Sequence, residues 1–433
     1  MNLIAKVYNN EELRKKILFL MVCLMIYKIG MHITVPWVNV ELLETIGRGE
    51  GLLSLVNSLN GGALANFSIF AVGIIPYITA SIVINLLQMD VIPSLTEWKR
   101  QGEAGRKKTK KLTYTASIFV ALVQSIAMSF GFNKMYPGLV ENESIPVYLI
   151  IALTLTLGTI ILLIMAEYID RKGIGKGISM IIFAGILMSL PNNLAMYYEL
   201  EFTGVGDTLF ISIIKTILLV IFAYSLLIAV IIVNGGERRV PIQHTSERKS
   251  HKNNFLPFKL NSAGVIPVIF ASAIIMTPMT IVEIFGVNKF TTFVNNYINY
   301  TSITGMILFF LIIIGMTYLY TFIQMNPKTL ADDLKNNESH VPSIKPGKDT
   351  EIYFKNLLVR LTLVGSVFLA VISIAPMVLG IITSLPQQLT LGGTSIIIIV
   401  SVVVDLKSQV SSALKTGDYK KQITLSGKKM FDK

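Results

Sequence analysis

Long apolar runs alternate with polar segments along most of this chain. A helix needs about 20 mainly apolar residues to cross the hydrocarbon core of a bilayer. Ten runs approach or exceed that length, and an even number of spans leaves both chain ends on one side of the membrane. The pattern predicts an all-α polytopic membrane protein with spans at 17–35, 67–89, 113–132, 147–167, 174–190, 208–233, 262–285, 303–324, 361–382 and 388–404.

The ten predicted spans divide into two sets of five. We expect an N-terminal half at 1–192, a C-terminal half at 193–405 and a polar tail at 406–433. Two successive sets of five spans have opposite topology, which is the arrangement of inverted repeats in many transporters. The number of spans alone predicts this arrangement, because no repeat of 20–50 residues is visible in the sequence.

The segment at 51–91 is apolar enough for a membrane but too interrupted to form one plain helix. Gly61 and Gly62 separate a short first piece from a long second one, which contains Pro76 and ends near Asn85. Non-helical backbone at membrane depth is tolerated only where protein buries it or water reaches it. We therefore expect a re-entrant piece at about 51–66 that lines a cavity or pore.

Charge sets the expected orientation. The chain has a net charge of +12 and only 15% charged residues. If the N-terminus is cytoplasmic, 33 of the 38 Lys and Arg residues lie on the inside and three lie outside. Since inside loops are enriched in Lys and Arg, both termini are predicted to be cytoplasmic. Two inside loops, 234–259 and 325–360, are long and basic, and loops of that length usually have a function.

The sequence offers little for catalysis or for ion coupling. RKGIGKGIS at 171–179 lacks the spacing of a phosphate-binding loop, and the four histidines are scattered. Cys23 is the one cysteine, and the spans contain few ionisable residues beyond Lys28, Lys215 and Glu167. Coupled transporters need such groups near the bilayer midplane. We predict a passive conduit that is not an enzyme and uses no cofactor or metal.

Several stretches resemble the SecY family, the channel-forming subunits of bacterial Sec protein translocases. They include GGALANFSIFAVGIIPYITASI at 61–82, LLQMDVIPSLTEWKRQGEAGRKK at 86–108, GIGKGISMIIFAGI at 173–186, LPFKLNSAGVIPVIFASAII at 256–275 and PSIKPGKDTEIYF at 342–354. The resemblance extends from about Leu13 to Leu406. It implies ten helices in two inverted, pseudo-symmetric halves around an hourglass pore, with a re-entrant plug helix.

The resemblance also implies a pore ring and a plug. The family's isoleucine ring maps to Ile74, Ile78, Ile178, Ile182, Ile269 and Ile398. An isoleucine in a span more often faces lipid or another helix, but two pairs here are four residues apart and share a helix face. Aliphatic side chains can gate a pore by dewetting and can close around a passing chain. The plug maps to Leu53, Val56, Asn57, Leu59, Gly61 and Gly62.

Two further sites follow from the same resemblance. A lateral gate between the second and third spans and the seventh and eighth is expected to contain Asn85, Gln124 and Asn261, unless these residues only join neighbouring helices. Docking of the ribosome or of the SecA motor is expected at Arg238, Arg239 and Lys345, although topology alone could account for these charges. Lys and Arg contact ribosomal RNA phosphates without reading sequence.

The implied function is translocation of unfolded preproteins across the bacterial plasma membrane, with hydrophobic segments released sideways into lipid. Expected partners are the small subunits SecE and SecG, SecA or the ribosome or both, preprotein signal sequences and membrane lipid. Three departures from the family pattern, Trp37, Lys176 and Lys345, are compatible with an accessory Sec channel for a restricted client set. A secondary transporter of small solutes, or a scaffold without a conducting path, remains the alternative.

Overall fold

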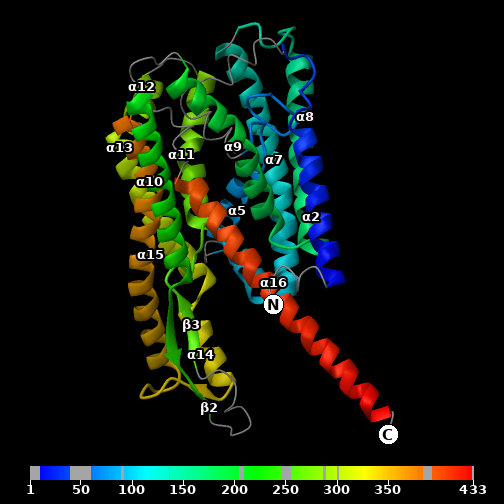
Figure 1. Ribbon diagram of the computed structural model, residues 1–433, viewed down its shortest axis with the longest axis vertical. Helices are drawn as coiled ribbons and strands as arrows, with labels where there is room; N and C mark the ends of the chain where they lie inside the picture. The colour runs from blue at the N-terminus through cyan, green and yellow to red at the C-terminus, as the bar shows by residue number, and fades with distance from the viewer. Residues whose placement is uncertain are drawn as a thin grey trace. The chain divides into compact units, whose positions relative to one another are not determined.

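The computed structural model describes residues 10–39, 60–88, 92–135, 137–203, 209–244, 255–285, 289–299, 302–383 and 393–431. Most of these residues are helical (Figure 1). The helices are α2 (Glu11–Gly30), α5 (Ile75–Leu87), α6 (Pro93–Arg100), α7 (Glu103–Met135), α8 (Ile145–Lys172), α9 (Gly177–Phe202), α10 (Leu209–Gly235), α11 (Ile266–Phe285), α12 (Lys289–Tyr297), α13 (Ile303–Gln324), α14 (Pro327–Asn336), α15 (Lys348–Thr383) and α16 (Gly393–Phe431).

Each of the ten predicted spans overlaps one of these helices. Among the described residues, seven helices are long and apolar enough to cross a membrane, in α7, α8, α9, α10, α13, α15 and α16. Shorter apolar helices occur in α5 and α11. Several helices continue beyond their apolar runs, and α16 is drawn as one continuous helix well past its predicted span (Figure 1). The chain is an all-α polytopic membrane protein.

The chain forms two compact units, each described by itself. Unit 1 comprises residues 1–80, 110–196 and 398–433, and unit 2 comprises residues 81–109 and 197–397. In unit 2, α13 packs against both α11 and α15, and α14 packs against α15. The predicted halves at 1–192 and 193–405, and their inverted symmetry, stay predictions.

A mostly buried non-helical segment, residues 60–74, belongs to unit 1. Its backbone pairs with the chain after α2, since Val35 N donates to Phe67 O at 3.0 Å and Ile69 N donates to Ile33 O at 3.0 Å. Phe67 is completely buried in a cluster with residues of α7 and α8. The predicted start of the second span at residue 67 is therefore wrong: the helix begins at Ile75, after Gly73 with a φ of +63°.

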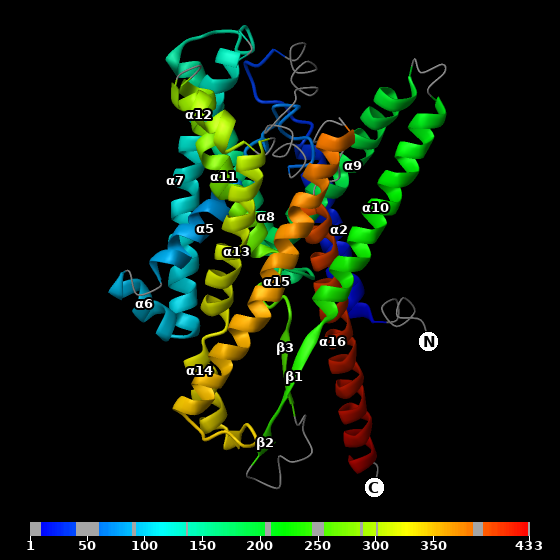
Figure 2. The same ribbon diagram turned by 90° about the vertical axis from the view of Figure 1, so that its left-hand side faces the viewer.

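Two small β-ribbons interrupt the helical architecture of unit 2. Strand β1 (Glu237–Pro241) pairs antiparallel with β3 (Phe255–Lys259), and β2 (Gln243–His244) pairs antiparallel with β4 (Ser339–His340). The second pairing joins the two long basic loops of the sequence, 234–259 and 325–360. We call β1 to β4, α14 and the start of α15 the loop module; it lies at one end of unit 2 (Figure 2).

Candidate pore, gate and docking residues

Five of the six isoleucines predicted to form the pore ring belong to unit 1. Ile74 is the last residue of the buried segment, and the others lie on helices: Ile78 on α5, Ile178 and Ile182 on α9, and Ile398 on α16. Their burial ranges from half-buried to almost complete. Ile269 is half-buried on α11 and belongs to unit 2. Closure of the six residues into one ring stays a prediction.

Polar contacts fix the start of α9, which carries two of these isoleucines. Gly177 N donates to Asp170 Oδ1 at 2.7 Å, so the last turn of α8 caps the N-terminus of α9. Gly175, with a φ of +90°, donates from its backbone N to Gln409 Oε1 at 2.9 Å. The α8–α9 turn is thereby bound to both α8 and α16, while Lys176 within it is exposed.

Four of the predicted plug residues, Leu53, Val56, Asn57 and Leu59, lie outside the described residues. Gly61 and Gly62 form turns with φ values of +70° and +90°, which favour glycine. A Cβ added at Gly61 would lie 2.6 Å from Met31 Cε and 2.9 Å from Gly185 O. Residues 60–66 are therefore turns and not helix, and Gly61 is closely surrounded in unit 1.

Asn60 lies within the predicted plug segment and is held by hydrogen bonds. Its Nδ2 donates to Ala71 O at 2.8 Å, and Tyr27 OH donates to Asn60 O at 3.2 Å. Asn60 is 5% exposed, and Tyr27 packs against Phe70 with ring centroids 5.7 Å apart. The first residues of the buried segment thus have little freedom to move.

The residues predicted at the lateral gate fall in different units. Gln124 is half-buried on α7 in unit 1, whereas Asn85 and Asn261 belong to unit 2. Asn85 Nδ2 donates to Ser81 Oγ at 3.4 Å within α5, and Asn261 Nδ2 donates to Asn234 Oδ1 at 2.9 Å. Asn261 Oδ1 is buried and accepts no hydrogen bond within the described chain. A polar cluster of all three stays a prediction.

The predicted docking residues lie on the loop module. A small core of Val240, Phe258, Val341, Phe354 and Leu358 holds the module together. Arg238 and Arg239 are exposed on β1, and Lys345 is exposed in the turn before α15. Arg239 is partly engaged, because its Nε lies 2.7 Å from Glu237 Oε1 and its guanidinium lies 4.8 Å from the Phe255 ring centroid. Thr350 Oγ1 donates to Lys345 O at 2.8 Å and steadies the turn.

Two of the ionisable residues that the sequence placed in or next to spans are paired. Lys215 Nζ lies 3.3 Å from Glu201 Oε1, and the Glu201 side chain is only 8% exposed. Glu167 Oε1 lies 2.7 Å from Arg171 Nη2 and 3.6 Å from Lys110 Nζ. Among the described residues, no group of His, Cys, Asp and Glu side chains could hold a metal ion.

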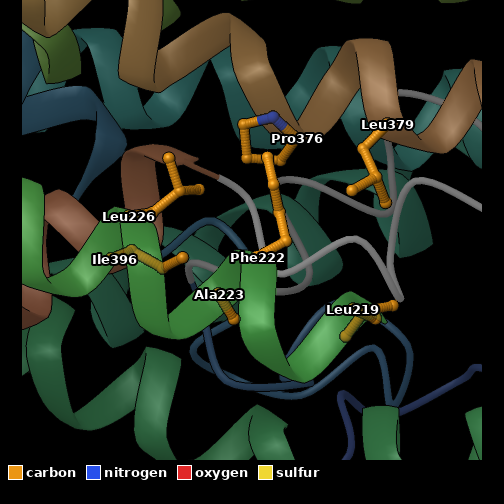
Figure 3. Close-up of a pocket in the computed structure, with 7 residues that line it drawn as sticks. All are labelled: Leu219, Phe222, Ala223, Leu226, Pro376, Leu379 and Ile396. Carbon is orange, nitrogen blue, oxygen red and sulfur yellow. The ribbon is translucent and has the colours of Figure 1, made fainter. Parts of the chain in front are cut away.

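An apolar recess lies among α10, α15 and the start of α16 in unit 2 (Figure 3). Its lining residues are all aliphatic or aromatic: Leu219, Phe222, Ala223, Leu226, Pro376, Leu379 and Ile396. Sites for small polar ligands combine an apolar wall with a few well-placed polar groups. This recess has no such groups and is unsuited to binding a polar solute.

Some structural contributors were missed by reading the sequence. Asp170 caps a helix that starts seven residues later, and its position just before the glycine-rich turn was the available signal. Gln409 reaches Gly175 from 234 residues away, which no local pattern indicates. The pairing of β2 with β4 was also missed, since strands of two residues leave no periodic signal.

The long apolar helices define a multi-pass membrane protein. The family model described as SecY matches residues 68–407. The protein translocase subunit SecY of Bacillus subtilis is 44% identical over 416 residues, which cover 95% of this chain and 96% of that protein. The corresponding subunit of Staphylococcus carnosus is 42% identical over 418 residues, covering 95% and 97%.

Solved structures agree in fold. A protein-conducting channel aligns with a TM-score of 0.64 at 18% identity and covers 92% of both chains. Sec61 in a canine ribosome-channel complex aligns with a TM-score of 0.61 at 18% identity, again over 92% of both chains. This chain belongs to the SecY family. It is a pore subunit of a protein-translocation channel.

Proposed function

We propose that unfolded preproteins thread through a ring formed by Ile74, Ile78, Ile178, Ile182, Ile269 and Ile398. The main supporting observation is that five of these residues lie on α5, α9, α11 and α16, and Ile74 directly precedes α5, in a chain that matches the SecY family over most of its length. A narrow apolar constriction excludes ions by dewetting, and flexible aliphatic side chains can fit around a polypeptide of any sequence. The pore needs no enzymatic activity and no cofactor in this chain.

The plug, by this proposal, seals the resting pore from its external side. The hydrogen bonds of Asn60 support a plug that is attached at its C-terminal part, because Asn60 is bound to Tyr27 of α2 and to Ala71. Deleting residues 53–58, which leaves Asn60 and both glycines in place, should raise ion conductance in planar bilayers. Translocation should continue, since the ring remains. Unchanged conductance would remove the plug from the proposal.

Sideways release into lipid is proposed at Asn85, Gln124 and Asn261. The unsatisfied Oδ1 of Asn261 supports a polar seam, since a buried acceptor without a partner is unusual in a folded protein. Interhelical hydrogen bonds in membranes average only about 0.6 kcal/mol. A seam held by a few of them would yield to an apolar signal sequence that partitions into lipid.

We propose a bacterial plasma membrane location with both termini in the cytoplasm, supported by the 33 to 3 distribution of Lys and Arg. That orientation places the loop module in the cytoplasm. Its exposed Arg238, Arg239 and Lys345 would meet the ribosome or the SecA motor, and SecE and SecG would complete the channel. At Lys345 a lysine keeps the charge but lacks the planar fork of arginine, which weakens bidentate contacts.

Crosslinking tests the ring directly. In a Cys23→Ser background, a single cysteine replaces either Ile182 or Leu187, which is 42% exposed on the same helix. A stalled preprotein carrying a thiol-reactive probe should crosslink to position 182 and not to position 187. Equal crosslinking at both positions, or none at position 182, would contradict the ring. Solute uptake by vesicles without preprotein transport would instead favour a secondary transporter.

A further inference from the structure

The short helix α12 lies between the apolar helix α11 and the spanning helix α13, and it packs against both. Helix α13 has 22 residues from Ile303 to Gln324. At 1.5 Å per residue it is about 33 Å long, close to the roughly 30 Å of a bilayer's hydrocarbon core. The first residue of α13 therefore lies at one edge of the hydrocarbon, and α12, directly before it, lies near the level of the lipid headgroups.

Contacts between α12 and α13 fix that position. Thr304 Oγ1 donates to Asn296 O at 3.2 Å, and Ser302 Oγ donates to Asn299 O at 2.7 Å. Gly305 packs so closely that an added Cβ would overlap the Asn299 carbonyl oxygen. The end of α12 is thereby attached to the first turn of α13 through its backbone, and α12 cannot rotate freely about its own axis.

Three stripes of different chemistry run along α12. Val294, which is completely buried, marks the stripe that packs against the protein. Lys289, Phe293 and Tyr297 are spaced four residues apart and form a second stripe; both aromatic side chains are 53% exposed, and their ring centroids are 5.0 Å apart. Thr292 and Asn296 are exposed and polar and form a third stripe, which adjoins the second and faces away from Val294.

We propose that α12 is an interfacial helix that inserts its Lys289–Phe293–Tyr297 stripe among the lipid headgroups and upper acyl chains. Amphipathic aromatic rings concentrate at this depth of a membrane, and a lysine can extend its amine toward the phosphates while its stem stays in the apolar layer. The polar stripe of Thr292 and Asn296 then faces water. The helix anchors the connection between α11 and α13 at a fixed depth.

Lipid fits this stripe better than a protein partner does. Ile303 and Ile307, one turn apart at the start of α13, are 73% and 55% exposed, so apolar surface continues from α12 into a spanning helix. A helix whose exposed face changes from an aromatic stripe to an adjoining polar stripe suits a boundary between two solvents. A binding site for a soluble partner would not need to be continuous with the lipid-facing surface of a membrane-spanning helix.

Depth-dependent fluorescence quenching tests the proposal. The chain has two tryptophans, Trp37 and Trp98, and replacing both with phenylalanine provides a background for one reporter. Phe293→Trp reports on the aromatic stripe, and Asn296→Trp on the neighbouring polar stripe is the matched control. The full-length chain, purified with its assembled subunits, is placed in phospholipid vesicles, and the reporter-free background is subtracted. Quenchers are phospholipid brominated near the top of its acyl chains and aqueous iodide.

Brominated lipid should quench the Phe293→Trp reporter several-fold more than the Asn296→Trp reporter, and iodide should show the reverse order. Tyr297→Trp, one turn along, is a second reporter if Phe293→Trp does not assemble. Strong quenching of Phe293→Trp by iodide with none by brominated lipid would overturn the proposal, because the stripe would face water. Protection of that reporter from both quenchers would also overturn it, because protein would then cover the stripe.

Discussion

Gly158 on α8 is the position where one added methyl group should have the largest effect on unit 1. A Cβ there would overlap the Ile69 carbonyl oxygen and would lie 2.7 Å from the Ile69 carbonyl carbon. The obstacle is backbone in the buried 60–74 segment, which is itself held by hydrogen bonds to Ile33 and Val35. Gly158→Ala can be accommodated only by moving α8 away from that segment.

Two opposing terms set the expected size of the effect. Alanine is better than glycine in a helix interior by about 1 kcal/mol. Overpacking of a well-packed interior costs about 1–3 kcal/mol, and occasionally more. We expect the upper end of that range, because a backbone carbonyl cannot turn away as a flexible side chain can. Gly158→Ala should therefore destabilise the protein by about 2 kcal/mol overall.

Cys23 provides the assay. It is the one cysteine of the chain and is 5% exposed on α2 in unit 1. A dye that fluoresces on reaction with thiols reports its exposure during heating in detergent. Gly315→Ala on α13 is the matched control, because a Cβ there meets no atom within 4 Å. The apparent midpoint should fall for Gly158→Ala and stay level or rise for Gly315→Ala. A rise for both would refute the close approach of α8 to the buried segment.

Three further predictions concern other contacts. Tyr27→Phe removes the hydrogen bond to Asn60 O and should lower the midpoint of thermal Cys23 exposure by the equivalent of about 0.5–1.5 kcal/mol. The loss should be near the low end, because Ala63 N also donates to that carbonyl. An unchanged midpoint would show the bond to be dispensable. Lys215→Ala leaves the buried Glu201 carboxylate without its partner and should reduce thermal stability, and adding Glu201→Gln should recover most of the loss; no recovery would contradict the pairing. Arg238→Ala should weaken ribosome binding more than Arg239→Ala does, because Glu237 already neutralises part of the charge of Arg239. Co-sedimentation with ribosomes at low salt measures the effect, and the opposite order would contradict this assignment.

Reading the sequence located the spans because hydropathy reports directly on contact with lipid. It was less accurate at their ends. Helix α15 begins at Lys348, well before the apolar run at 361–382, and α16 extends beyond Asp405 into the polar tail. Lipid solvation sets where a helix enters the membrane, but backbone hydrogen bonding continues until glycine, proline or a capping side chain ends the helix.

The buried segment shows a second limit of the sequence. Gly61 and Gly62 correctly indicated a break before the second span. The non-helical backbone extends to Ile74, because partners elsewhere in the chain satisfy it, and Pro76 lies in the first turn of α5. Ile33 and Gly158 lie far from the buried segment in sequence, and no local pattern reveals these contacts. The ring, the gate and the docking residues were assigned by family resemblance, since isolated isoleucines and asparagines in spans carry no distinctive signal of their own.

The β2–β4 pairing has a consequence for genetics. Gln243 and His244 align with His340 and Ser339, so the two basic loops share one small fold although about 95 residues separate them in sequence. A substitution that distorts either loop should disturb the surface presented by the other. Second-site suppressors of export defects at Arg238 should therefore arise near Lys345 as readily as within the first loop, and the two loops should vary together among related bacteria.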